Sequence, residues 1–132
     1  MMSDTINIER SVDIEGVLKA ALAAKFTAYC PPLPATLSLP CVEVSQVGGS
    51  RSKRLDTFTI KLDSRAETEA TAIEQLNNAV GYLIAVAEQN TTAIRAVTIN
   101  AAGSWGQDPA RPDLAMATAT LLVCAHQERT TL

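Results

Sequence analysis

Two stretches of alternating apolar and polar residues flank a glycine pair, Gly48-Gly49. The first stretch covers residues 41–47 and the second covers residues 56–63. A period of two is typical of strands with one buried and one wetter face. The connecting loop from Gly48 to Leu55 is basic and longer than a tight hairpin turn. We therefore expect an antiparallel pair of strands with a protruding tip.

Two other segments have the spacing of amphipathic helices. The first begins near Asp13 as an N-cap and runs to about Ala28, with apolar residues at i, i+3 and i+4. It must end before Pro31-Pro32 because proline removes a hydrogen-bond donor. The second begins at 64–67, where Ser-Arg-Ala-Glu has the spacing of a capping box, and ends by Asn90. Its apolar stripe predicts a helix that lies across the sheet.

The remaining segments complete an α+β pattern. A third strand is expected at about 94–101, a loop at 103–113, and a long last strand at about 114–125. The small and apolar composition of the last strand indicates a central position, covered on both faces at least in part. The order α-β-β-α-β-β predicts an α+β fold with a mixed or antiparallel four-stranded sheet packed against two helices.

The length of the chain fits one domain. We expect residues 1–132 to form it, with residues 1–12 as an N-terminal segment that is either flexible or an assembly arm. Apolar residues make up 47% and charged residues 19% of the chain, which excludes a disordered tail. No signal peptide or membrane-spanning stretch is evident, so an intracellular, soluble protein is expected.

The charge and the cysteines exclude several classes of function. Eleven basic and 14 acidic residues give a net charge of −3, which does not favour attraction to nucleic acid or to an anionic membrane. The three cysteines form no CxxC pair, which argues against a zinc ribbon or a redox motif. We expect reduced thiols that pack as small apolar residues.

No motif in the chain indicates catalysis. His126 is the only histidine, and the spacing pairs it with neither Ser104 nor Cys124 as a nucleophile. Metal-binding and calcium-loop motifs are missing from the sequence. The glycine pair leads into a strand rather than a helix, so a turn is favoured over a phosphate cradle. We expect no enzyme activity, no cofactor and no metal.

Two loops carry candidate interaction residues. Arg51, Lys53 and Arg54 form either a solvated loop or a contact with acidic groups of a protein partner. No aromatic residue lies among them, which disfavours nucleic acid. Trp105 lies in a loop rich in Gly, Pro and Asp, where it is either a core plug or a binding hot spot.

With these segments placed, the chain resembles the tail terminator proteins of long-tailed bacteriophages, also called minor tail or tail completion proteins. The resemblance rests on four features in this order: Leu39-Pro-Cys-Val-Glu-Val leading into Gly48-Gly49 and a basic loop; the alternating strand at 56–63; the Ala-rich helix from Glu67; and Trp105-Gly-Gln-Asp108-Pro109 with Arg111-Pro112 before a long strand. Together they cover roughly residues 13–125.

The resemblance implies a structural virion protein located at the head–tail interface. Such a subunit forms a homo-oligomeric ring, expected to be hexameric, which caps the tail tube and stops its polymerisation. It also presents a surface to the head–tail connector protein, and DNA passes through its lumen without specific binding. A ring needs a heterologous interface, in which one patch meets a different patch on the neighbour.

The resemblance also assigns roles to the two loops. The basic tip, with Arg51, Lys53 and Arg54, is expected to contact a neighbouring subunit or the tail-tube protein. The second loop, with Trp105, Asp108 and Arg111, is expected to shape a ring contact. Two alternatives stay open. One is a head-proximal neck or connector protein of similar fold. The other is a small α+β ligand-binding domain or enzyme with a pocket near Trp105 or His126.

Overall fold

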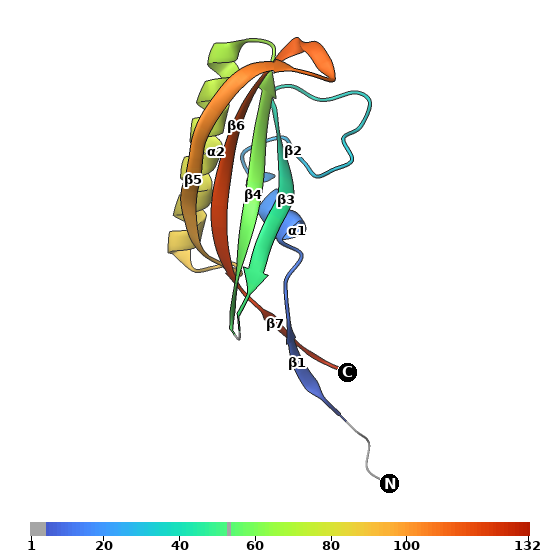
Figure 1. The fold of residues 1–132 in the computed structure, drawn as a ribbon, viewed down its shortest axis with the longest axis vertical. Coiled ribbons are helices and arrows are strands. Elements are labelled where there is room, and N and C mark those ends of the chain that lie inside the picture. The colour runs from blue at the N-terminus through green and yellow to red at the C-terminus, as the bar shows by residue number, and fades with distance from the viewer. Residues whose placement is uncertain (1–4, 53) are drawn as a thin grey trace.

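The computed structural model describes residues 5–52 and 54–132, and for residues 102–105 the backbone alone. The described residues form two helices and seven strands: β1 (Asn7–Arg10), α1 (Ile14–Leu22), β2 (Ala28–Tyr29), β3 (Cys41–Arg51), β4 (Leu55–Ala66), α2 (Glu69–Gln89), β5 (Ile94–Asp108), β6 (Arg111–His126) and β7 (Glu128–Thr131). Five strands form one sheet in the order β2-β3-β4-β6-β5 (Figure 1). The other two, β1 and β7, pair with each other in a separate sheet.

The predicted four-stranded sheet is wrong, because the protein is mostly β and has two sheets. The prediction missed β1, β2 and β7, which have only four, two and four residues. Strands this short carry too few residues for a period of two to stand out. Among the described strands, only β2 is parallel to its neighbour, β3, and the other pairs are antiparallel.

The glycine pair lies inside β3 rather than in the turn. β3 continues to Arg51 and pairs with β4 along its whole length, with a bulge between Gln46 and Gly48. The predicted loop from Gly48 to Leu55 is therefore too long. A Cβ atom on Gly49 would lie 2.8 Å from the carbonyl oxygen of Thr57, so glycine is needed there for the close approach of the two strands.

We predict different effects for alanine at the two glycines. Gly49→Ala is expected to lower the free energy of unfolding by about 1–3 kcal/mol, because the added methyl group collides with the backbone of β4. Gly48→Ala serves as the control, since its Cβ would lie 3.7 Å from Thr59, an ordinary contact. Urea denaturation of both variants measures the difference, and equal losses would contradict this role of Gly49.

Both helices are shorter than the sequence predicts. α1 ends at Leu22 rather than near Ala28, and α2 begins at Glu69. The N-cap of α2 is Thr68, whose Oγ1 accepts a hydrogen bond from the Thr71 amide (3.3 Å). The predicted capping box at 64–67 is wrong because its first three residues belong to β4 and pair in the sheet.

The helices pack on one face of the five-stranded sheet. Both lie behind the sheet in Figure 1, and their apolar residues join those of alternate strand positions in a single core. β6 lies between β4 and β5, as its composition predicts. Within the described residues no helix covers the second face, where threonines, Lys61 and Leu122 are half-buried.

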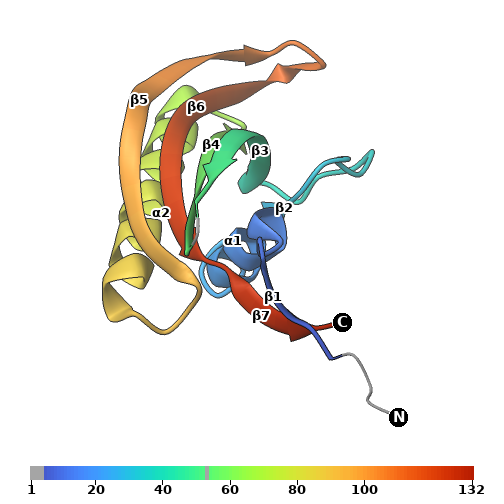
Figure 2. The ribbon, with the colours of Figure 1, turned by 60° about the horizontal axis from the view of Figure 1, so that its bottom comes forward.

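The β5–β6 hairpin is much longer than predicted. Most of the expected loop at 103–113 is strand, because β5 continues to Asp108 and β6 begins at Arg111. The hairpin curves strongly and projects beyond the rest of the sheet (Figure 2). β1 and β7 project from the opposite end, so the molecule carries an extension at each end of its main sheet (Figures 1 and 2).

Candidate assembly surfaces

A buried charge cluster fixes the base of the β5–β6 hairpin. The Arg65 guanidinium on β4 donates from Nε to Asp108 Oδ2 (2.7 Å) and from Nη1 to Glu43 Oε1 (2.9 Å). All three residues are at least nine-tenths buried. The cluster therefore joins β3, β4 and β5 at one end of the sheet by charge-assisted hydrogen bonds.

The pKa of Asp108 reflects this environment. Burial alone would raise the pKa of its carboxyl group. The hydrogen bonds from Arg65 and from the Ala110 amide outweigh burial and hold that pKa below its usual range. Asp108 is thus an ionised structural residue, and its carboxylate is already occupied within the subunit.

The other residues predicted for this loop have different surroundings. Arg111 donates from Nη2 to the Pro34 carbonyl oxygen (2.8 Å) and so ties the hairpin to the proline-rich segment at 30–40. The backbone of Trp105 pairs with Ala117, but its side chain lies outside the described residues. Both interpretations of Trp105, as a residue that plugs the core and as a binding hot spot, therefore stay predictions.

The basic tip lies at the opposite end of the sheet (Figure 1). Arg54 is exposed there, Arg51 donates a hydrogen bond to the Glu9 carbonyl oxygen of β1, and Lys53 lies outside the described residues. Among the described side chains of the predicted set, Arg51 and Arg54 therefore lie in one region and Asp108 and Arg111 in another, and the structure does not bring the two groups together.

A second buried carboxylate holds the tip and the chain ends in place. Asp56 is 1% exposed, and its Oδ1 accepts a hydrogen bond from Gln127 Nε2 (2.9 Å), which also donates to the Ser52 carbonyl oxygen (2.8 Å). Burial would raise the pKa of Asp56, but hydrogen bonds from Ser11 and Gln127 keep it below its usual range. These contacts link the β3–β4 turn to the residue that joins β6 to β7.

The sheet of β1 and β7, which we call the arm, extends beyond this end of the molecule. Asn7 pairs with Thr131 and Arg10 pairs with Glu128, with an ion pair of 2.6 Å between Arg10 Nε and Glu128 Oε1. The backbones of Ile6 and Leu132 continue the pairing. β1 and β7 contact each other but make little contact with the main sheet.

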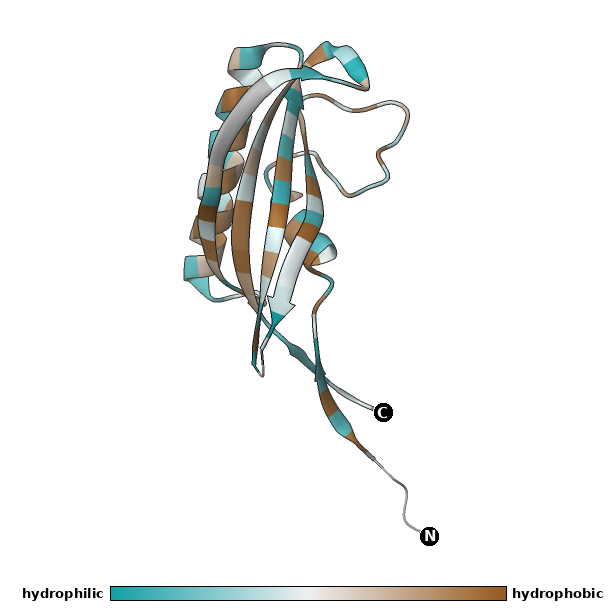
Figure 3. Ribbon diagram, viewed as in Figure 1, coloured by the Kyte–Doolittle hydropathy of each residue, from teal (hydrophilic) through white to brown (hydrophobic). Residues whose placement is uncertain are grey.

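The arm is amphipathic. Successive residues of a strand point to opposite faces, and paired residues of two strands share a face. One face therefore carries Ile6, Ile8, Thr130 and Leu132 toward its outer end and the Arg10–Glu128 ion pair at its base. The other face carries Asn7, Glu9, Arg129 and Thr131. Two apolar residues, Ile6 and Ile8, flank the polar Asn7 at the outer end of the arm, which Figure 3 shows as two hydrophobic segments separated by a hydrophilic one. Ile6 is 58% exposed, so the apolar face has no core of its own. The sequence predicts residues 1–12 as either a flexible segment or an assembly arm, but it does not predict this strand pair.

A groove of apolar residues lies on the other side of the molecule, between α2 and the edge strand β5. Its volume is about 270 Å³, and it is lined by Leu76, Asn77, Val80, Gly81, Ile84, Ile99 and Ala119. Ile99 is 51% exposed. The adjoining helix α2 carries Glu69, Glu74 and Glu88 and no basic residue. Arg95 on β5 is half-buried and donates to the Thr92 carbonyl oxygen, so the helix side of the groove is the acidic one.

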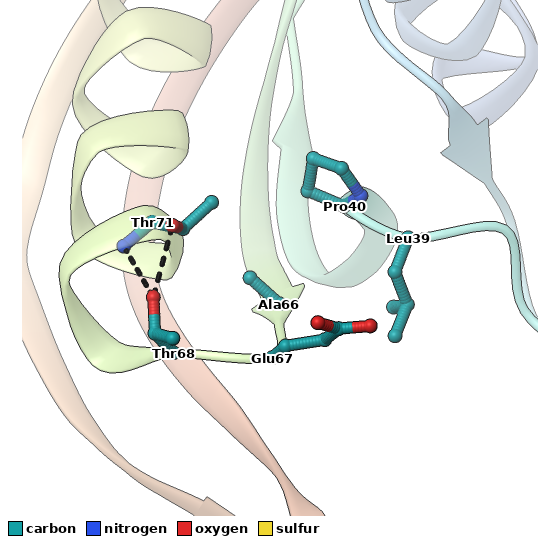
Figure 4. Close-up of a pocket in the computed structure, with 6 residues that line it drawn as sticks. All are labelled: Leu39, Pro40, Ala66, Glu67, Thr68 and Thr71. Atoms are coloured by element: carbon teal, nitrogen blue, oxygen red, sulfur yellow. Dashed lines mark hydrogen bonds between the residues drawn. The ribbon is translucent and has the colours of Figure 1, made fainter.

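Other hollows lie at the start of α2 and at the base of the arm. The pocket in Figure 4 lies at the start of α2, where Thr68 caps the helix and the Glu67 carboxylate extends toward Leu39. An acidic side chain at a helix N-terminus already provides the negative charge that the helix dipole favours. His126 is exposed and borders two hollows at the base of the arm. Among the described residues, no group of three His, Cys, Asp or Glu could hold a metal ion.

No protein-family model matches the chain, and no curated protein is significantly similar to it. Among the residues that the structure describes, no helix is both long and apolar enough to span a membrane.

Proposed function

We propose that the chain is a structural virion protein, the tail terminator of a long-tailed bacteriophage. Its copies form a ring, expected to be a hexamer, that caps the tail tube, ends tube polymerisation and joins the tube to the head connector. The four sequence features of the resemblance support this proposal. The alternating strand and the Ala-rich helix correspond to β4 and α2, and the last feature corresponds to the β5–β6 hairpin.

The amphipathic arm is the observation that carries the proposal. A two-stranded sheet is marginally stable in water unless its apolar face is packed. Ile6 and Leu132 are 58% and 74% exposed on an arm that makes little contact with its own subunit. In a larger assembly another subunit can cover the apolar face of such an arm and thereby stabilise it. The long, exposed edge strand β5 offers a further assembly surface.

Native mass spectrometry over a concentration series tests the proposal. We expect a ring-sized species, hexameric by the resemblance, that grows with protein concentration at the expense of the monomer. Negative-stain electron microscopy of the same sample should show rings with a central opening. A protein that stays monomeric at every concentration would contradict a ring that assembles by itself.

A further inference from the structure

We infer that the arm of one subunit docks in the groove between α2 and β5 of the next subunit, an interaction that rests on the proposed ring. The apolar face of the arm supplies Ile6 and Ile8 as the inserting side chains. The groove supplies Val80 and Ile84 from α2 and Ile99 from β5. A second copy of this chain is thus the partner of both surfaces.

The two surfaces match in size and polarity. A dry apolar cavity of about 150 Å³ accommodates a molecule as large as benzene. A groove of about 270 Å³ therefore has room for two aliphatic side chains. Ile6 and Ile8 are two residues apart on one strand, so both point to the same face of the arm and enter the groove together.

Their placement suits a ring. In Figures 1 and 2 the arm leaves the body on the side away from β5, which borders the groove. An arm on one side and its acceptor on the other form a head-to-tail contact, in which each subunit gives one arm and receives another. Such a contact leaves no arm or groove unused when the ring closes.

The charges around the two surfaces are complementary. The arm and the neighbouring tip carry Arg10, Arg51, Arg54 and Arg129 against the exposed acidic residues Glu9 and Glu128. α2 beside the groove carries only acidic charges. Opposite signs favour the encounter of two subunits and disfavour contact between like surfaces.

Cysteine cross-linking between two singly substituted proteins tests the docking. One protein carries Thr130→Cys on the apolar face of the arm, and the other carries Asn77→Cys in the groove. Both also carry Cys30→Ser and Cys124→Ser, which leaves the buried Cys41 as the only native cysteine. We expect a disulfide-linked dimer after mild oxidation of the mixture. The matched control is Thr131→Cys, one residue along on the polar face of the arm, which should cross-link to Asn77→Cys far less.

A variant with Ile6→Asp and Ile8→Asp gives an independent readout. It should raise the protein concentration needed for ring formation by at least about tenfold, because two buried aliphatic contacts are lost. Its thermal unfolding should stay close to wild type, since the arm does not pack on the core. Rings that form at the wild-type concentration, or rings without the Thr130–Asn77 cross-link, would overturn the docking and leave the proposed function standing. A wild-type protein that is monomeric at every concentration would overturn both the docking and a ring that assembles by itself.

Discussion

Replacement of Arg65 by methionine is expected to lower the free energy of unfolding by about 3–5 kcal/mol. The methionine fills the volume of the side chain but leaves the carboxylates of Glu43 and Asp108 buried without their shared cation. Two unpaired charges of the same sign then lie in a region of low polarity, and each loses its strongest hydrogen bond. Urea denaturation at neutral pH measures the loss.

The pH dependence of this variant distinguishes a lost ion pair from a lost packing contact. In the wild type the pKa of Asp108 is lower in the folded than in the unfolded chain. Its contribution to stability is therefore present above the unfolded value of about 3.9 and is lost as the pH falls through the folded pKa. Without Arg65, burial raises the pKa of Asp108, so the sign reverses and the variant gains stability as the pH falls from 7 toward 5. A variant whose stability loss does not change with pH would contradict the electrostatic explanation.

Lys61→Met provides a matched control on the same strand and the same face of the sheet. Lys61 Nζ lies 3.4 Å from Asp63 Oδ2, but its side chain is 43% exposed. Water screens such a pair, so the expected loss is below about 1 kcal/mol. A loss as large as that of Arg65→Met would show that burial does not account for the stability that the Arg65 cluster provides.

The helices and the long strands could be predicted from the sequence because their apolar residues repeat over many positions. Residues 69–89 repeat with the period of a helix, and 55–66 alternate with the period of a strand. The ends of the elements could not be predicted in this way. Ser64 and Glu67 have capping-box spacing, but the pairing of Ser64 with Ala117 keeps it in β4, because tertiary contacts outweigh a local signal.

The candidate site was less predictable than the fold. The sequence predicts Asp108 in a loop at 103–113, where it shapes a ring contact, yet its carboxylate is buried against Arg65, which is 43 positions away in the sequence. Likewise the arm requires β1 to meet β7 from the other end of the chain. Such long-range contacts leave no local pattern in the sequence. β1 contains a single apolar residue, Ile8, and β7 contains none, so neither segment has the alternation that predicts a strand.

Leu121→Ala and Leu122→Ala test the one-sided architecture of the main sheet. These neighbours on β6 point to opposite faces, and Leu121 is fully buried among the core residues beneath the helices. Its replacement is expected to cost about 3–5 kcal/mol, because it removes buried methyl groups and leaves a cavity. Leu122 is half-buried on the face without helices, so its replacement should cost less than about 1.5 kcal/mol.

The two variants must be compared at protein concentrations where the chain is monomeric. Under these conditions only contacts within one subunit contribute to the free energy of unfolding. Equal losses for the two leucines would show that the second face is packed as tightly as the first, which would contradict a sheet covered by helices on one side. A loss for Leu122→Ala that grows with protein concentration would instead show that another copy covers this face in the assembly.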